Sequence, residues 1–179
     1  MPAAGVKYDL RNGYELAFVD ADVRRVVDAV LGSMLAADYS VDPAVTGNIT
    51  LRTQQPVAKE SLVPLLEEAL ASVNAAIVMR GRSYRVVSRS AARANAPIAG
   101  DASGSGATIG YASEIVRLKN ASAREVARLL EQFLGKDIIA GTDVAYNQIV
   151  ITGSADERRA ARAVIERFDV DMLANTNFE

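Results

Sequence analysis

Residues 14–35 read YELAFVDADVRRVVDAVLGSML, and the spacing of apolar side chains changes within this stretch. The first of them occupy alternate positions, as in a half-buried strand: Tyr14, Leu16 and Phe18. The later ones recur at helical spacing and form one stripe: Val23, Val26, Val27, Val30, Leu31, Met34 and Leu35. Asp20 or Asp22 stands where a helix cap is expected. The stretch therefore predicts a strand over 14–20 that leads directly into a helix over 23–35.

The rest of the first half continues this alternation of strands and helices. Short alternating or apolar runs predict four more strands: 39–42, 49–53, 75–79 and 84–87. A second helix is expected from about Ser61, because proline is tolerated in a first helical turn and Pro64 then fits. Gly81 lies between the last two strands, which favours a hairpin. Residues 14–88 are therefore expected to form an α+β domain of order β-α-β-β-α-β-β, after an N-terminal tail over 1–13.

The composition changes between the two halves of the chain. From Ser88 to about Thr108 the sequence is dominated by Ala, Gly, Ser, Asn and Pro and shows no apolar period. A flexible chain of about 20 residues has an r.m.s. span on the order of 25 Å. We predict a flexible linker over 89–112 that separates two small domains. Residues 171–179 fit neither domain and are expected to connect to a further module of a longer protein.

The second half predicts a shorter α+β domain over 113–170, of order β-α-β-β-α. Two helices are expected to begin with capping boxes, in Ser122 with Glu125 and in Ser154 with Glu157. Helical spacing predicts their inward side chains: Val126, Leu129, Leu130, Phe133, Leu134, Ala161, Val164, Ile165 and Phe168. Strands are predicted at three apolar runs: 114–118, 138–140 and 148–152.

Composition narrows the range of functions. The 179 residues include no cysteine and no histidine, which removes thiol nucleophiles, His-based triads and zinc sites built on Cys or His. The net charge is −2, so the basic excess that drives phosphate binding is missing and nucleic acid is not an expected partner. No apolar run approaches the ~20 residues that span a bilayer. We expect neither an enzyme nor a cofactor, and no small-molecule substrate.

Two acidic pairs are explained more simply by structure than by chemistry. Asp20 and Asp22 are suited to capping a helix. Glu67 and Glu68 lie near a predicted helix start, where the helix dipole favours acidic side chains. Neither pair is predicted to be a catalytic or metal site.

Longer motifs in both halves resemble those of bacterial outer-membrane secretins. The first half carries FVDADV at 18–23 and YSVDPAVTGNITL at 39–51. The second half carries IVRLKNASA at 115–123, YNQIVITG at 146–153 and IERFD at 165–169. Their order along the chain is that of the secretin pattern. The type II secretion branch is the most similar, because its first domain is followed directly by modules of the second kind.

The resemblance implies a fold, a location and a set of partners. The first domain would be like the short N-terminal domain of secretins and TonB-dependent receptors, and the second would be KH-like. Together they would form a periplasmic ring and docking module of an outer-membrane channel. Such a module binds an inner-membrane component of the secretion system and neighbouring secretin subunits, and exported proteins are a further expected partner. The alternatives are a type IV pilus or phage-type secretin, or the periplasmic signalling domain of a TonB-dependent receptor, which resembles the first half alone.

Candidate docking residues lie on two predicted strands of the first domain. A strand at the edge of a sheet leaves N–H and C=O groups that a partner's strand can complete. The positions predicted to face outward on these strands are Glu15, Ala17, Val19, Thr50 and Arg52. The sequence does not decide which of the two strands is the edge.

Three arginines form a second candidate surface at the predicted hairpin. Arg80, Arg82 and Arg85 lie on both sides of its glycine turn. A solvated turn is the simpler interpretation of this cluster. Docking of an acidic partner is the alternative.

Overall fold

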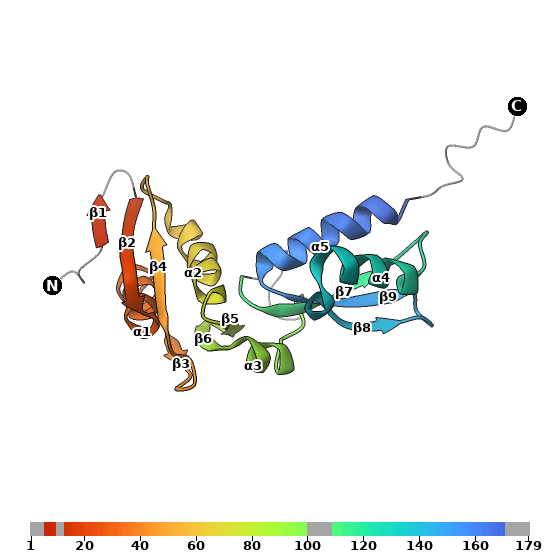
Figure 1. Ribbon diagram of the computed structural model, residues 1–179, viewed down its shortest axis with the longest axis horizontal. Coiled ribbons are helices and arrows are strands. Elements are labelled where there is room, and N and C mark those ends of the chain that lie inside the picture. The colour runs from red at the N-terminus through yellow and green to blue at the C-terminus, as the bar shows by residue number, and fades with distance from the viewer. Residues whose placement is uncertain (1–5, 10–12, 100–108, 171–179) are drawn as a thin grey trace, which may run out of the picture. The chain divides into compact units, whose positions relative to one another are not determined.

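The computed structural model describes residues 6–9, 13–99 and 109–170 of the chain. It divides into two compact units (Figure 1). The first unit extends to Pro97 and also includes Ile109–Tyr111, and the second includes Ile98 and the residues from Ala112 onward. The segment 171–179, predicted to be a connector, lies outside the described residues.

Two three-stranded sheets build the first unit. One has the order β1-β2-β4 and is antiparallel: β1 (Val6–Asp9), β2 (Gly13–Asp22) and β4 (Asn48–Arg52). The other has the order β3-β6-β5, with β3 parallel to β6: β3 (Tyr39–Val41), β6 (Ser83–Ser88) and β5 (Ala75–Arg80). The predicted N-terminal tail over 1–13 is therefore wrong in part, because β1 pairs with the first half of β2.

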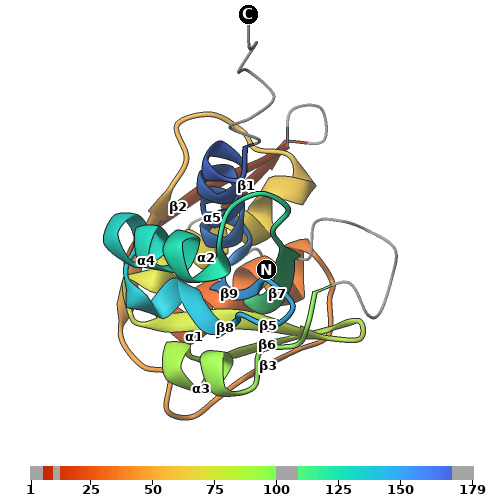
Figure 2. The ribbon, with the colours of Figure 1, turned by 90° about the vertical axis from the view of Figure 1, so that its right-hand side faces the viewer.

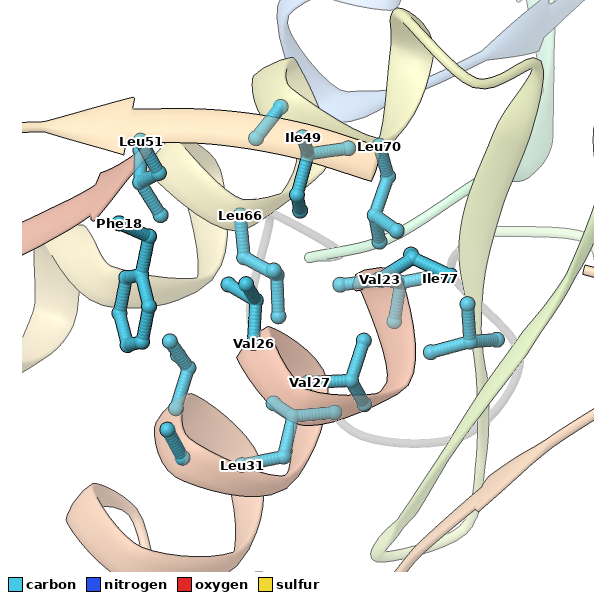
Figure 3. Close-up of a cluster of buried hydrophobic side chains, with 14 of the residues drawn as sticks. Phe18, Val23, Val26, Val27, Leu31, Ile49, Leu51, Leu66, Leu70 and Ile77 are labelled. Atoms are coloured by element: carbon cyan, nitrogen blue, oxygen red, sulfur yellow. The ribbon is translucent and has the colours of Figure 1, made fainter. Parts of the chain in front are cut away.

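The helices of the first unit supply most of its core. The helical elements before β5 are α1 (Val23–Val27), the π-helix η1 (Asp28–Met34), the 3-10 turn η2 (Lys59–Ser61) and α2 (Leu62–Ala71). Figure 3 shows their apolar side chains converging with those of β2, β4 and β5. Leu66 and Leu70 of α2 are fully buried, as is Val26 of α1. One apolar cluster therefore joins both sheets through the helices.

The junction between β2 and α1 was predicted correctly in outline, including Asp22 as one of its two alternative caps, and wrongly in one detail. Asp22 is the cap, and its carboxylate accepts hydrogen bonds from the backbone N–H groups of Arg24 at 2.9 Å and Arg25 at 3.4 Å. Asp20 instead accepts a hydrogen bond from the side chain of Asn48 and has a positive φ of 48°. The predicted single α-helix over 23–35 becomes a π-helix after Val27.

The predicted flexible linker over 89–112 is only partly a connector. Its first residues form helix α3 (Arg89–Ala94), which begins at a Ser88 cap. Tyr111 is 1% exposed, lies in a small apolar cluster with Val78, Val87 and Ala92, and donates its backbone N–H to the carbonyl of Ile77. Two features of this stretch were not predicted, because few of its residues are large and apolar. They are the short alanine-rich helix α3 and the buried ring of Tyr111.

The second unit is a three-stranded antiparallel sheet with two helices. Its elements are β7 (Ala112–Arg117), α4 (Ala123–Leu134), the 3-10 turn η3 (Lys136–Ile138), β8 (Ile139–Asp143), β9 (Gln148–Gly153) and α5 (Ala155–Phe168). The strand order is β7-β9-β8. Figures 1 and 2 show both helices on one side of this sheet. The core lies between the helices and the sheet and includes Leu130, Ile149, Ile151 and Ile165.

Two sequence predictions for the helices of this unit are wrong. Ser122 makes no side-chain capping bond, so the first capping box is absent, whereas the box of Ser154 and Glu157 is present. The inward stripe also ends early, because three side chains predicted to be buried are exposed: Phe133, Leu134 and Phe168. A helical apolar stripe looks the same in sequence whether its own sheet covers it or not. None of the described helices is long and apolar enough to cross a membrane.

Candidate interaction surfaces

The five predicted docking residues lie on one face of the β1-β2-β4 sheet. All are exposed: Glu15, Ala17, Val19, Thr50 and Arg52. Their neighbours Leu16 and Phe18 are buried, as the alternation of a strand requires. Ala17 lies directly opposite Arg52 in the ladder of β2 and β4. The structure therefore brings residues from two distant parts of the sequence onto one solvent-facing surface, hereafter the β2/β4 face.

The strand pairing indicates where each strand has an open side. β1 pairs with β2 along Gly13–Leu16 and β4 pairs with it along Ala17–Asp22, so the first part of β2 is covered on its β1 side and both sequence alternatives stay open for the rest. Among the described residues, no strand pairs with the other side of β4. The N–H of Thr53 donates to the carbonyl of Leu16 at 2.9 Å. Because backbone groups alternate in direction along a strand, those of Thr50 and Arg52 point to the open side.

A bulge in β2 shapes the far end of this face. The register between β2 and β4 shifts between Phe18 and Ala21. The hydroxyl of Thr50 accepts a hydrogen bond from the backbone N–H of Asp20 at 3.1 Å, and Asn48 donates to the Asp20 carboxylate at 3.0 Å. Val19 is held outward within this bulge and is 62% exposed. It is the large apolar side chain that the described part of the first unit leaves in solvent.

In the second unit, three family-like motifs meet at the loop between β7 and α4, hereafter the 118–123 loop. The Asp169 carboxylate accepts hydrogen bonds from three consecutive backbone N–H groups, those of Lys119, Asn120 and Ala121, at 2.6–3.1 Å. Desolvation tends to raise the pKa of Asp169, but these hydrogen bonds and the Lys119 charge outweigh it and lower the pKa from its ordinary value. The carboxylate therefore holds the loop most strongly when it is ionised.

Asn147 also holds the same loop through its side chain. Its side-chain oxygen accepts a hydrogen bond from the N–H of Ala123 at 2.8 Å, in place of the predicted Ser122 cap. Its side-chain nitrogen donates to the carbonyls of Leu118 at 3.2 Å and Ala121 at 3.0 Å. Asn147 also has a positive φ of 52°, which asparagine tolerates better than most residues. Asp169 and Asn147, two residues of the family-like motifs, therefore hold the 118–123 loop in place.

Several large apolar side chains of the second unit are exposed. Phe133 is 63% exposed and stacks on Phe168, with ring centroids 6.4 Å apart. Leu134 and Val170 are also exposed. On the sheet side away from the helices, Ile115 is 49% exposed and lies opposite Val150. Helical spacing did not indicate the aromatic surface, because it predicted that Phe133 and Phe168 are buried.

One shallow hollow opens beside β3, with a volume of about 550 Å³ and lined by Arg24, Asp28, Tyr39, Ser40, Val41 and Pro43. The hydroxyl of Tyr39 donates a hydrogen bond to Asp28, and this bond, with burial and the Asp28 charge, raises the pKa of Tyr39. Arg24 donates to the carbonyl of Pro43 at 2.9 Å. The polar groups of the hollow thus bond to one another. Among the described residues, no group of three acidic side chains is placed to hold a metal ion.

Comparison with known families assigns both units. Residues 16–86 match a family described as the GspD-like N0 domain. Residues 113–173 match the bacterial type II/III secretion system short domain. The two matches follow one another in the order that the sequence motifs indicated.

Curated relatives extend the match across both units. The chain is 36% identical over 157 residues to the secretin XpsD of Xanthomonas campestris, which covers 88% of this chain and 21% of that protein. It is 28% identical over 174 residues to the putative secretin GspD of Escherichia coli K12, covering 95% of this chain and 26% of that protein. The chain thus spans about a quarter of the length of these relatives.

A solved structure shares the fold. The Klebsiella pneumoniae type II secretion system outer-membrane complex, which contains PulD, PulS and the PulC HR domain, matches with a TM-score of 0.63 at 24% identity, covering 86% of this chain and 26% of that one. The predicted type II branch is confirmed by the two family matches and the named relatives. The chain belongs to the type II secretion secretins, and its two units correspond to N-terminal domains of that family.

Proposed function

We propose that this chain is the periplasmic docking and ring-forming part of an outer-membrane secretin channel. The first unit binds an inner-membrane component of the secretion system, and the second unit contacts neighbouring subunits. The chain is proposed to perform no reaction, and exported proteins are further proposed partners that pass along it. The similarity to secretins over both units supports this proposal, as does the presence of PulD with the PulC HR domain in one similar complex.

The observation that carries the docking role is the open side of β4 next to the exposed Val19. Backbone groups of Thr50 and Arg52 point away from β2, and Ala17 and Val19 form a small apolar strip beside them. An incoming strand gains affinity from main-chain hydrogen bonds and specificity from side chains at alternate positions. The β2/β4 face offers both within one surface.

Hydrogen exchange tests this assignment directly. Binding of the partner's periplasmic domain is expected to slow exchange of the Thr50 and Arg52 amides, which otherwise face solvent. The amide of Thr53 serves as an internal control, because it already donates to Leu16 and its exchange changes little. Protection confined to other elements, with Thr50 and Arg52 unchanged, would remove β4 as the docking edge.

The second unit presents two different surfaces suited to ring formation. Phe133 and Phe168 lie on its helical side, whereas Ile115 and Val150 lie on the side of the sheet away from the helices. Head-to-tail contacts between unlike surfaces of identical subunits close into rings when the rotation permits. We therefore propose that the aromatic side of one copy packs on the sheet of the next.

Cysteine cross-linking tests this contact, because these 179 residues contain no cysteine and any cysteine elsewhere in the full-length secretin is first replaced by serine. In the full-length secretin, Phe133→Cys together with Ile115→Cys is expected to give ladders of linked subunits under oxidation. The exposed Ser122→Cys with Ile115→Cys is the matched control and is expected to remain unlinked. Equal linking of both pairs, or of neither, would reject this arrangement.

We also propose that the second unit is KH-like, as the β-α-β-β-α order supports. An RNA-binding KH domain clamps the backbone with a G-x-x-G loop. Gly135 follows α4, but the sequence Gly-Lys-Asp-Ile at 135–138 has no second glycine. The KH-like unit is therefore assigned to protein contacts.

A further inference from the structure

The strand β2 departs from regular pairing at the β2/β4 face. The register shifts between Phe18 and Ala21, because β2 has one residue more there than β4. Val19 and Asp20 together oppose Thr50 and are hereafter the β2 bulge. Bulges of this kind redirect side chains, and they are over-represented next to functional sites.

The β2 bulge changes which side chains face solvent. Strict alternation from the buried Phe18 would turn Asp20 toward the core and Ala21 outward. In the structure Val19 and Asp20 are both exposed, and Ala21 packs against the core instead. The extra residue thus keeps the Asp20 charge out of the core, but this purpose does not require a large apolar side chain at position 19.

Two side chains of β4 hold the β2 bulge in one conformation. The Asp20 backbone N–H donates to the Thr50 hydroxyl at 3.1 Å, and the Asn48 side chain donates to the Asp20 carboxylate at 3.0 Å. Asp20 has a positive φ of 48°, a conformation that costs energy for residues other than glycine and persists where its surroundings determine it. Val19 therefore projects into solvent from a backbone that is fixed before any partner binds.

Val19 has the features of an anchor residue at an interface. Its side chain is 62% exposed, the small Ala17 lies on the same face, and Asp20 beside it is polar and exposed. An apolar centre with a polar rim is typical of contacts in which a partner's pocket buries one anchor. A backbone fixed in advance lowers the ordering cost of burying that anchor.

We propose that Val19 is a specificity-determining residue of the docking surface, and that Thr50 is a positioning residue that acts through it. This inference rests on the proposed docking function and deepens it. The edge of β4 supplies backbone hydrogen bonds that any extended chain can form, whereas Val19 selects a partner with an apolar pocket. A strand added on the open side of β4 lies two strand spacings, ~10 Å, from β2. The pocket therefore belongs to a folded domain that extends over the face, and not to the added strand itself.

Binding kinetics test the anchor, with the complete chain applied to the immobilised periplasmic domain of the inner-membrane partner. Val19→Ala is expected to raise the dissociation rate about tenfold, the order expected when two methyl groups leave an apolar pocket, with little change in the association rate. Val144→Ala is the matched control, because that valine is 55% exposed in the second unit and its variant should bind as the wild type does. Wild-type dissociation of Val19→Ala overturns the proposal.

A double-mutant cycle tests the positioning role of Thr50. Thr50→Val keeps the shape of the side chain and its backbone N–H, but it removes the acceptor of the Asp20 N–H. The dissociation rate is expected to rise at least about threefold, and exchange of the Asp20 amide is expected to become faster. Thr50→Ser keeps the hydroxyl and should restore both. In the Val19→Ala background, Thr50→Val should have no further effect on dissociation, because both changes then act on one contact.

The outcomes separate this inference from the docking role. An equal loss on Thr50→Val with and without the Val19 side chain would show that Thr50 acts independently, which rejects the positioning role. Weak binding of Arg52→Pro together with unchanged binding of Val19→Ala would reject the anchor and leave docking at the β4 edge intact. Failure of the wild-type chain to bind the partner domain would contradict both.

Discussion

At the scale of single residues, the family-like motifs of the second unit are explained by one loop. Asp169 and Asn147 lie far apart in sequence from the 118–123 loop, yet together they satisfy its backbone N–H and C=O groups. A loop with unsatisfied backbone groups is costly when it packs against a core. These two residues therefore fix the start of α4, which in turn positions Leu130 in the core.

The Asp169 carboxylate gives this loop a pH-dependent stability. Its pKa is lowered in the folded chain, so its contribution is present above the ordinary value of 3.8 and is lost as pH falls through the lower folded value. Asp169→Asn is expected to destabilise the second unit by about 1 kcal/mol at neutral pH, since bonds to a charged group are stronger but this one is near solvent.

Denaturant titrations of the second unit at neutral and acidic pH measure this effect. The difference between wild type and Asp169→Asn is expected to shrink as pH falls below 3.8. The exposed Glu166→Gln is the matched control and is expected to show no such difference. A difference that persists unchanged in acid would show that the charge is not what holds the loop.

At the scale of secondary structure, the two apolar periods of residues 14–35 predicted β2 and the following helix. Burial follows every second residue in the strand and helical spacing in the helix. The same reasoning failed for α4, whose stripe continues past the part that its sheet covers. Leu130 is fully buried, but Phe133 is 63% exposed on the same helix. Periodicity shows which face of a helix is apolar, and it carries no information on what covers that face.

Alanine substitutions along α4 measure this difference. Leu130→Ala is expected to lower the free energy of unfolding by about 2–5 kcal/mol, because it leaves a cavity in a closed core. Phe133→Ala is expected to change it by less than about 0.5 kcal/mol, since its ring is largely in solvent. Urea denaturation of the two variants compares them. A large loss for Phe133→Ala would mean that the ring supports the isolated fold and is not reserved for a neighbour.

In strands, too, periodicity predicts which side chains face outward but not which strands pair, as the five candidate docking residues show. Alternation was sufficient to predict that Glu15, Ala17, Val19, Thr50 and Arg52 face outward. Which strand is the edge depends on pairing between distant segments, including β1, which the sequence presented as a tail. The placement of all five on one face is likewise a tertiary result.

At the scale of the whole chain, Tyr111 shows that the first unit includes residues that follow the Ala/Gly/Ser-rich stretch. It belongs to the first unit, although Ala112, the next residue, begins β7 of the second. Its buried ring lies against the Arg89 guanidinium, 5.7 Å from the ring centroid. The first unit is therefore completed by a residue that follows the low-complexity stretch, which composition alone did not indicate.

Removal of this ring is expected to destabilise the first unit. Tyr111→Ala should cost about 3 kcal/mol, in the range of buried aromatic truncations. Tyr146→Ala is the matched control, because that ring is 67% exposed and its loss should cost less than about 0.5 kcal/mol. Thermal unfolding followed by amide signals of β5 and β6 reads the first unit separately. Equal effects of the two variants would exclude Tyr111 from the folding unit.

If the chain offers a backbone edge to its partner, proline at Arg52 should weaken that binding. Thr50→Pro would also remove the hydroxyl that accepts the Asp20 N–H, whereas Arg52 makes no such bond. Arg52→Pro removes one outward N–H, which an edge strand tolerates, and Arg52→Ala removes the side chain but keeps the N–H.

Calorimetric titration with the periplasmic domain of the inner-membrane partner supplies the measurement. We expect Arg52→Ala to bind within a few-fold of wild type. Arg52→Pro, with its amide spectrum otherwise preserved, is expected to bind at least about tenfold more weakly, a loss of roughly 1.4 kcal/mol. Wild-type affinity in a folded Arg52→Pro chain would contradict docking at the β4 edge.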